Sequence, residues 1–128
     1  MGMNLVNGLS DGNDIISGLL APTLAELTHP TARQFRIFAE HTGADRQALA
    51  ACMETSRQPM ARADVRRIAV PVLVAVGEAD DMAGDPAPLA DLLPHGRAFT
   101  IPKRDHMRST GDKAFKAETL AFLGKTFA

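Results

Sequence analysis

The sequence lacks the residues that mark several specialised classes of protein. It contains one cysteine, Cys52, so it cannot form an internal disulfide, and no second cysteine offers metal-ligand spacing. It has no tryptophan and no tyrosine, which removes the interleaved aromatics of single-strand nucleic-acid binders. The single cysteine fits a reducing compartment. We therefore expect a cytoplasmic protein that needs no metal or other cofactor.

An excess of charge and a long apolar run are also absent. The 14 Lys and Arg residues against 15 Asp and Glu leave a net charge of -1, which gives no field for nucleic acid or an anionic membrane. Apolar runs such as AVPVLVAVG fall well short of the roughly 20 residues of a spanning helix. The N-terminal MGMNLVNGLSDGND has no basic start followed by an apolar stretch, so it does not read as a secretory signal. At 128 residues, we predict one soluble structural unit.

The first half of the chain has a helical pattern. Residues 31–42 follow a proline and carry Phe35, Phe38 and Ala39 at the i, i+3, i+4 spacing of one buried face. A helix with that face inside turns Arg36 toward solvent. No strand-like run interrupts this half.

A further helix is expected after Asp45, which has the side chain of an N-cap. Its inner face would hold Leu49, Cys52 and Met53. We interpret Cys52 as a core residue, because a buried cysteine behaves as a small apolar group.

The second half alternates strands and helices. Residues 70–77, VPVLVAVG, are continuously apolar and β-branched, which indicates a strand covered on both faces in a parallel sheet. A helix is expected at 88–93, a second strand at 97–101 and a final helix at 112–127. This order is the βαβ signature of a parallel α/β sheet. The predicted division is 1–67 for a loop and helices and 68–128 for the sheet, in one structural unit.

Two strands are few for a doubly wound sheet, and MNLV near the N-terminus is considered as a short third strand. An exposed apolar strand edge lowers solubility. The pattern therefore predicts part of a larger sheet.

Polar side chains follow both predicted strands. Asp80 and Asp81 follow the first strand and His106 follows the second, 26 residues after Asp80. The carboxyl ends of parallel strands meet at one edge of a sheet, so a carboxylate and the imidazole could come into contact there. Such a carboxylate fixes the histidine tautomer and stabilises the imidazolium. Either aspartate could instead cap a turn. The remaining histidines follow no strand and are expected to be structural or solvated: His29, His41 and His95.

The segment IAVPVLVAVGEADDMAGDPAPLADLLPHGRAFTIPKRDHM resembles the C-terminal region of α/β-hydrolase-fold enzymes. There, a strand ending in G-x-x-D is followed by a helix, a strand, a loop with a histidine and a closing helix. The likeness extends over residues 68–123 and implies Asp80 as the acid and His106 as the base of a Ser-Asp-His triad, with Asp81 as the nearest competitor. The helices of residues 23–67 resemble, more weakly, the cap over the substrate pocket of such enzymes.

GLSDG, residues 8–12, fits the G-x-S-x-G pattern of a nucleophile elbow. An elbow needs an apolar strand before its serine and a long helix after it. The residues before Ser10 are few and half polar, and residues 12–14 are weak helix formers. We therefore interpret Ser10 as a loop residue on the way into the cap.

These patterns lead to two hypotheses of different kinds. The first is the C-terminal portion of an α/β-hydrolase that acts on an ester, lactone or similar acyl bond of a small molecule, with the nucleophile elbow missing and no ordinary activity by itself. The second is a non-catalytic interaction module that dimerises, or complements an N-terminal half of the fold, through its exposed sheet edge. A nucleotide-binding domain is less favoured, because no G-x-G-x-x-G or P-loop follows either strand.

Overall fold

The structure is a computed structural model that describes residues 2–8, 12–56 and 58–126. The chain forms two compact units: one comprises Met1–Gly8 with Pro59–Ala128, and the other comprises Leu9–Gln58. The predicted boundary at residue 67 does not coincide with this division, because residues 59–67 and the N-terminal segment belong with the sheet. Ser10 lies outside the described residues, and so does residue 127, the last of the predicted final helix.

The sheet unit contains two parallel strands. β1 (Val72–Gly77) pairs with β2 (Gly96–Ile101) in a register that runs from Val72 opposite Gly96 to Gly77 opposite Ile101. The short helix α6 (Ala87–Ala90) lies in the crossover between them. This parallel strand–helix–strand arrangement confirms the predicted α/β class and is consistent with part of an α/β-hydrolase fold. The expected helix at 88–93 is shorter, since residues 91–95 form turns.

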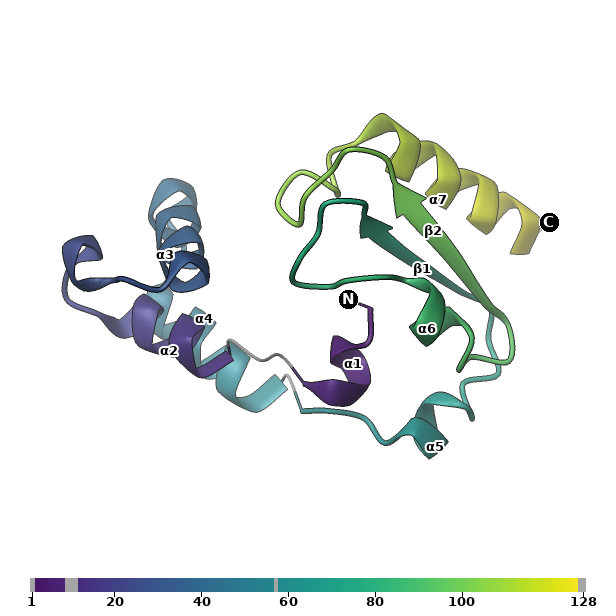
Figure 1. The fold of residues 1–128 in the computed structure, drawn as a ribbon, viewed down its shortest axis with the longest axis horizontal. Helices are drawn as coiled ribbons and strands as arrows, with labels where there is room; N and C mark the ends of the chain where they lie inside the picture. Colours follow the sequence, from purple (N-terminus) through teal and green to yellow (C-terminus); the bar gives the residue numbers. More distant parts are fainter. Residues whose placement is uncertain (1, 9–11, 57, 127–128) are drawn as a thin grey trace. The chain divides into compact units, whose positions relative to one another are not determined.

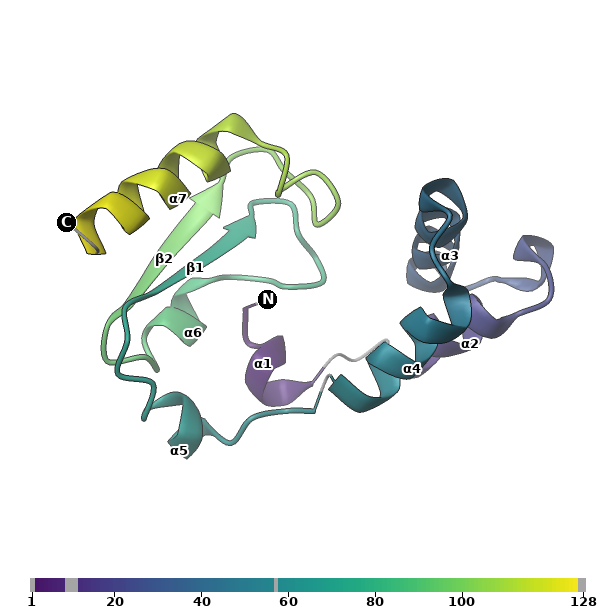
Figure 2. The same cartoon turned by 180° about the vertical axis from the view of Figure 1, so that it is seen from behind.

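Three more helices complete this unit: α1 (Asn4–Asn7), α5 (Arg62–Val65) and α7 (Lys113–Thr126). α6 and α7 lie on opposite sides of the strand pair (Figures 1 and 2). The buried core consists of residues from α5, β1 and the segment that includes α6: Val65, Val74, Val76, Ala83, Leu89, Ala90 and Leu93. The long helix α7 has no fully buried residue; its described side chains are half-buried or exposed.

The prediction of a short strand at MNLV is wrong, because Asn4–Asn7 form the helix α1. Its backbone groups bond locally: Val6 N and Asn7 N donate to Met3 O, both at 2.9 Å. In the described parts of the chain the sheet consists of β1 and β2, and this segment pairs with neither of them. Hydrogen bonds within the helical turn satisfy its backbone groups instead.

The second unit is helical, as predicted. It contains α2 (Gly12–Leu20), a 3₁₀ turn η1 (Leu24–Glu26), α3 (Pro30–Thr42) and α4 (Arg46–Ser56). Its buried apolar residues come from all three α-helices: Ile15, Leu19, Ala32, Ala39 and Ala50. Asp45 caps α4 as predicted, with its Oδ1 accepting from Gln47 N at 2.9 Å and Ala48 N at 3.1 Å.

Two predictions about α3 are wrong. Phe38 is 49% exposed, whereas Arg36 is 3% exposed and lies on the same buried face as Ala32 and Ala39. The cause is the close approach of α2: a Cβ at Gly18 would lie 2.8 Å from the Cβ of Ala32. Small residues therefore form this interface, and the face that contains Phe38 turns outward.

The prediction that Cys52 belongs to the core is also wrong, since Cys52 is exposed. α4 buries Ala50 instead. Leu49 and Met53 of the predicted face are half-buried, so the inner face shifts only toward Ala50. Cys52 points outward because it is two residues from Ala50, about 200° around the helix.

No helix in the described ranges combines the length and the apolar character that crossing a membrane requires.

Candidate acid–histidine site

The two loops that carry the predicted site residues begin at neighbouring strand ends. β1 ends at Gly77, where a Cβ would overlap the carbonyl oxygen of Arg104 and lie 2.7 Å from Ser109 Oγ. Glycine therefore lets the loop after β2 fold directly over the end of β1. This close approach requires no unusual backbone angle at Gly77, only the missing side chain.

Three hydrogen bonds donated by main-chain N–H groups join these loops. Glu78 N donates to Ile101 O at 2.9 Å, and Ala79 N donates to Arg104 O at 2.9 Å. Lys103 N donates to Glu78 Oε2 at 2.8 Å. The parallel pairing of the strands thus continues into the loops and fixes the position of one loop relative to the other.

Asp80 and His106 meet at this junction. The distance from His106 Nδ1 to Asp80 Oδ2 is 2.9 Å. Asp80 is 7% exposed, and its Oδ1 accepts from Met82 N at 3.0 Å and Ala83 N at 2.8 Å. The two roles weighed for an aspartate after the strand therefore occur in one residue: Oδ1 closes the turn and Oδ2 contacts the imidazole.

The arrangement favours one histidine tautomer. A carboxylate can only accept a hydrogen bond, so the proton of this contact belongs to Nδ1. Nε2 of His106 then has a free lone pair, and the His106 side chain is 42% exposed. A carboxylate-oriented imidazole of this kind can remove a proton from a hydroxyl and stabilise its own positive charge. Asp81, the competing residue, is exposed, and the contact belongs to Asp80.

The histidine loop is stabilised by residues that sequence reasoning missed. Ser109 is buried, and its Oγ donates to Asp105 O at 2.7 Å. Arg104 Nε donates to Asp112 Oδ2 at 2.6 Å. This hydrogen bond is the main cause that lowers the pKa of Asp112. The one available sequence signal was the position of Asp112 directly before the last helix, where its Oδ1 accepts from Ala114 N at 2.7 Å.

The remaining serines and histidines differ in exposure and in hydrogen bonding. In the described part of the sheet unit Ser109 is the one serine, and its hydroxyl donates to Asp105 O rather than to His106. In the helical unit Ser17 is exposed. Ser10 lies outside the described residues. His41 and His95 are exposed, and His29 is half-buried. Within the same ranges, no group of three or more His, Cys, Asp or Glu residues could hold a metal ion.

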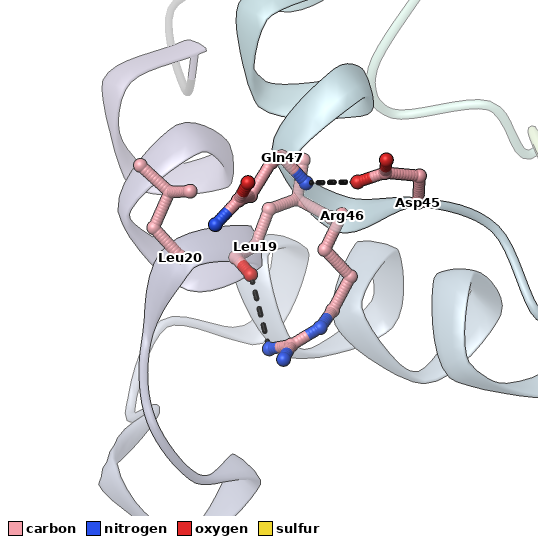
Figure 3. A pocket seen from close by; sticks show the side chains of 5 residues that line it. All are labelled: Leu19, Leu20, Asp45, Arg46 and Gln47. Carbon is pink, nitrogen blue, oxygen red and sulfur yellow. Dashed lines mark hydrogen bonds between the residues drawn. The ribbon is translucent and has the colours of Figure 1, made fainter.

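The described surface has a hollow in each unit. One of about 280 Å³ lies between the end of α2 and the start of α4, with Arg46 donating to Leu19 O at 3.2 Å (Figure 3). The polar groups that line it already have partners within the helical unit: Arg46 bonds to a carbonyl at the end of α2, and Asp45 caps α4. The other, of about 520 Å³, is lined by residues of the histidine loop and of the first turn of α7: Arg104, Arg108, Gly111, Asp112 and Lys113.

Comparison with known proteins relates the fold to a hydrolase. No protein-family model matches the chain, and no curated protein matches it. The crystal structure of a hydrolase from Pseudomonas aeruginosa PA01 is similar, with a TM-score of 0.57 and 28% sequence identity over 88% of this chain. The chain spans 43% of the length of that hydrolase. The likeness supports a hydrolase fold relationship for this chain.

Proposed function

We propose that this chain carries the acid and the base of a Ser-Asp-His triad in an α/β-hydrolase that cleaves an ester, lactone or similar acyl bond of a small molecule. The observation that carries the proposal is the 2.9 Å contact between His106 Nδ1 and Asp80 Oδ2, made by loops at the ends of adjacent parallel strands. The carboxyl ends of such strands are where α/β proteins place ligands and catalytic groups.

In this proposal His106 acts as general base and then as general acid. Its Nε2 takes the proton from a serine hydroxyl as the serine oxygen attacks the acyl carbon, and Asp80 stabilises the imidazolium that forms. His106 then gives that proton to the leaving oxygen as the bond from the acyl carbon breaks. Water repeats the sequence on the acyl-serine intermediate and releases the acid.

The serine and the oxyanion-binding N–H groups would come from a part of the fold not provided by residues 2–8, 12–56 and 58–126. In the described part of the sheet unit the one serine, Ser109, donates to Asp105 O, and the chain spans 43% of the similar hydrolase. The helices α2, α3 and α4 would form the cap over the substrate pocket.

A chimera tests the role of the pair directly. This chain replaces the matching segment of the Pseudomonas aeruginosa hydrolase, and hydrolysis of an activated ester is measured. We expect Asp80→Asn and His106→Gln each to lower kcat by about 10³-fold or more, as removal of a triad member does. The matched controls Asp81→Asn and His95→Gln leave kcat unchanged. Equal activity of His106→Gln and the parent chimera contradicts the proposal.

The chain alone provides a second measurement. Incubation with a serine-directed phosphonate should label no residue, because in this proposal the chain by itself does not supply the activated serine with which the phosphonate reacts. Covalent labelling of Ser10 would instead make GLSDG a nucleophile elbow.

The alternative, a non-catalytic interaction module, is favoured by the strand pair. Each strand pairs on one edge with the other, and the described residues supply no strand for their outer edges. Such an edge could pair with a second copy of this chain or with an N-terminal half of the fold. A concentration-independent monomer in sedimentation equilibrium would count against self-pairing, and failure of the chimera to fold would count against complementation.

A further inference from the structure

A chain of hydrogen bonds links the N-terminal helix to the acid–histidine pair. The side-chain amide of Asn4 donates to the carbonyl oxygen of Met82, 78 residues away. This carbonyl and the N–H of Ala83 belong to one peptide group, and that N–H donates to Asp80 Oδ1 at 2.8 Å. The other carboxylate oxygen contacts His106 Nδ1 at 2.9 Å. The bonds therefore run without a gap from Asn4 to the imidazole.

The segment around Asn4 is fixed on the same loop at a second point. Gly2 is buried, has φ +43°, and lies so close to the carbonyl oxygen of Ala83 that a Cβ would overlap it. Next to Asn4 in α1, the carbonyl oxygen of Leu5 accepts from Met60 N at 2.8 Å. These contacts limit the positions that the Asn4 side chain can take relative to the loop.

We propose that Asn4 is a positioning residue for Asp80 and His106. A peptide group that accepts a hydrogen bond on its oxygen is polarised, and its N–H becomes a stronger donor. The Asn4 amide therefore strengthens the bond from Ala83 N to Asp80 and fixes the plane of that peptide. With Oδ1 held in this way, Oδ2 points at Nδ1 of His106. This role rests on the proposed function of the pair.

The donor group is what the proposal requires of position 4. Of the two polar groups in the asparagine side chain, the NH₂ is the one that can bond to a carbonyl oxygen, because the amide oxygen can only accept a hydrogen bond. Asn7 provides a matched control, since it lies in the same helix and is exposed.

The test follows His106 and Ala83 by NMR in the full chain. Nitrogen shifts of the imidazole report the ratio of its two tautomers, and hydrogen exchange reports the Ala83 N–H. For Asn4→Ala we expect about threefold to tenfold faster exchange at Ala83, the range for loss of one neutral hydrogen bond. We also expect about a twofold to fivefold rise in the Nε2–H tautomer of His106 at unchanged fold, as judged by the urea midpoint.

The control and the conservative variant separate positioning from packing. Asn7→Ala leaves both signals at their original values, and Asn4→Gln, which keeps the donor, recovers part of the loss. If Asn4→Ala does not fold, Asn4→Gln and Asn4→Met make the same comparison, because they match in length and differ in the donor. Identical tautomer ratios in the donor-free variant and the parent, or equal losses in Asn4→Gln and the donor-free variant, overturn the proposal.

These readouts do not depend on catalysis. An inactive chimera would remove the proposed function and leave the NMR result as it stands. Conversely, an active chimera that depends on His106, together with an imidazole insensitive to Asn4, would overturn only the positioning role.

Discussion

Arg36 provides a stringent test of how the helical unit is stabilised. The last carbonyl groups of a helix have no partner within it, and Pro22 cannot supply the N–H that would bond to Gly18 O. Arg36 supplies donors instead: Nη1 to Gly18 O at 3.3 Å and to Ala21 O at 2.6 Å, and Nη2 to Pro22 O at 3.4 Å. We expect Arg36→Met, which keeps the apolar stem, to destabilise this unit strongly.

The magnitude follows from the number and quality of these bonds. Only the bond to Ala21 O is short, and Arg46 also donates to that oxygen at 3.3 Å. A hydrogen bond from a charged donor contributes about 1.5–3 kcal/mol, and a buried acceptor left without a partner costs about 1–3 kcal/mol. One strong bond and one unpartnered carbonyl, Gly18 O, give about 2.5–6 kcal/mol for Arg36→Met. That loss is a large part of the free energy of unfolding of a typical domain, which is about 5–15 kcal/mol.

Urea unfolding followed by far-UV circular dichroism measures the change in the free energy of unfolding. Glu40 pairs with Arg36 Nε at 2.6 Å but is half exposed, so Glu40→Gln should cost less than about 1 kcal/mol. Arg36→Lys keeps the charge without the forked donors and should fall between the two. A value for Arg36→Met within about 0.5 kcal/mol of that for Glu40→Gln would refute the role of the carbonyl contacts.

Two further predictions concern the loops around the acid–histidine pair. Gly77→Ala should lower the free energy of unfolding by about 1–3 kcal/mol, because the added Cβ would overlap Arg104 O, and it should shift the NMR signals of the His106 imidazole. Gly111→Ala, where a Cβ meets open space, is the control. Equal unfolding midpoints for the two variants would contradict the prediction. For Asp112, the Arg104 hydrogen bond lowers the pKa below its ordinary value of 3.8, so the carboxylate is stabilising above that value and this contribution is lost as the pH falls below it. The difference in urea midpoint between the parent and Asp112→Asn should therefore be constant near neutral pH and shrink in acid, and a difference that grew in acid would contradict it.

The parallel sheet and its edge could be predicted because their signals are local. Continuous β-branched runs indicate buried parallel strands, and the order of strand, helix, strand fixes which loops lie at the same edge. That reasoning placed Asp80, Asp81 and His106 near one another. It did not choose between the two aspartates, because the choice depends on the turn: Oδ1 of Asp80 accepts from Met82 N and Ala83 N, which directs the other oxygen toward the histidine.

The helical unit shows what periodicity leaves out. The spacing of Phe35, Phe38 and Ala39 indicates a helix correctly, but the buried face depends on which helix packs there and how closely. Gly18 lets α2 approach so near to Ala32 that no phenylalanine fits between them. Arg36 is buried at this interface because the end of α2 presents carbonyl groups that need donors. A polar residue can thus occupy a core position for a reason that lies in another helix.

The same limit applies with greater force to Asn4. Its neighbours in the sequence suggest a strand, and four residues of mixed polarity cannot distinguish a strand from a helical turn. Its contact with Met82 joins segments 78 residues apart and depends on the close approach of Gly2 to Ala83. No periodicity within either segment encodes that contact, since each is determined by the packing of the other. Residues that position a predicted site from a distance are therefore found in the folded chain, whereas the groups at the strand ends can be found in the sequence.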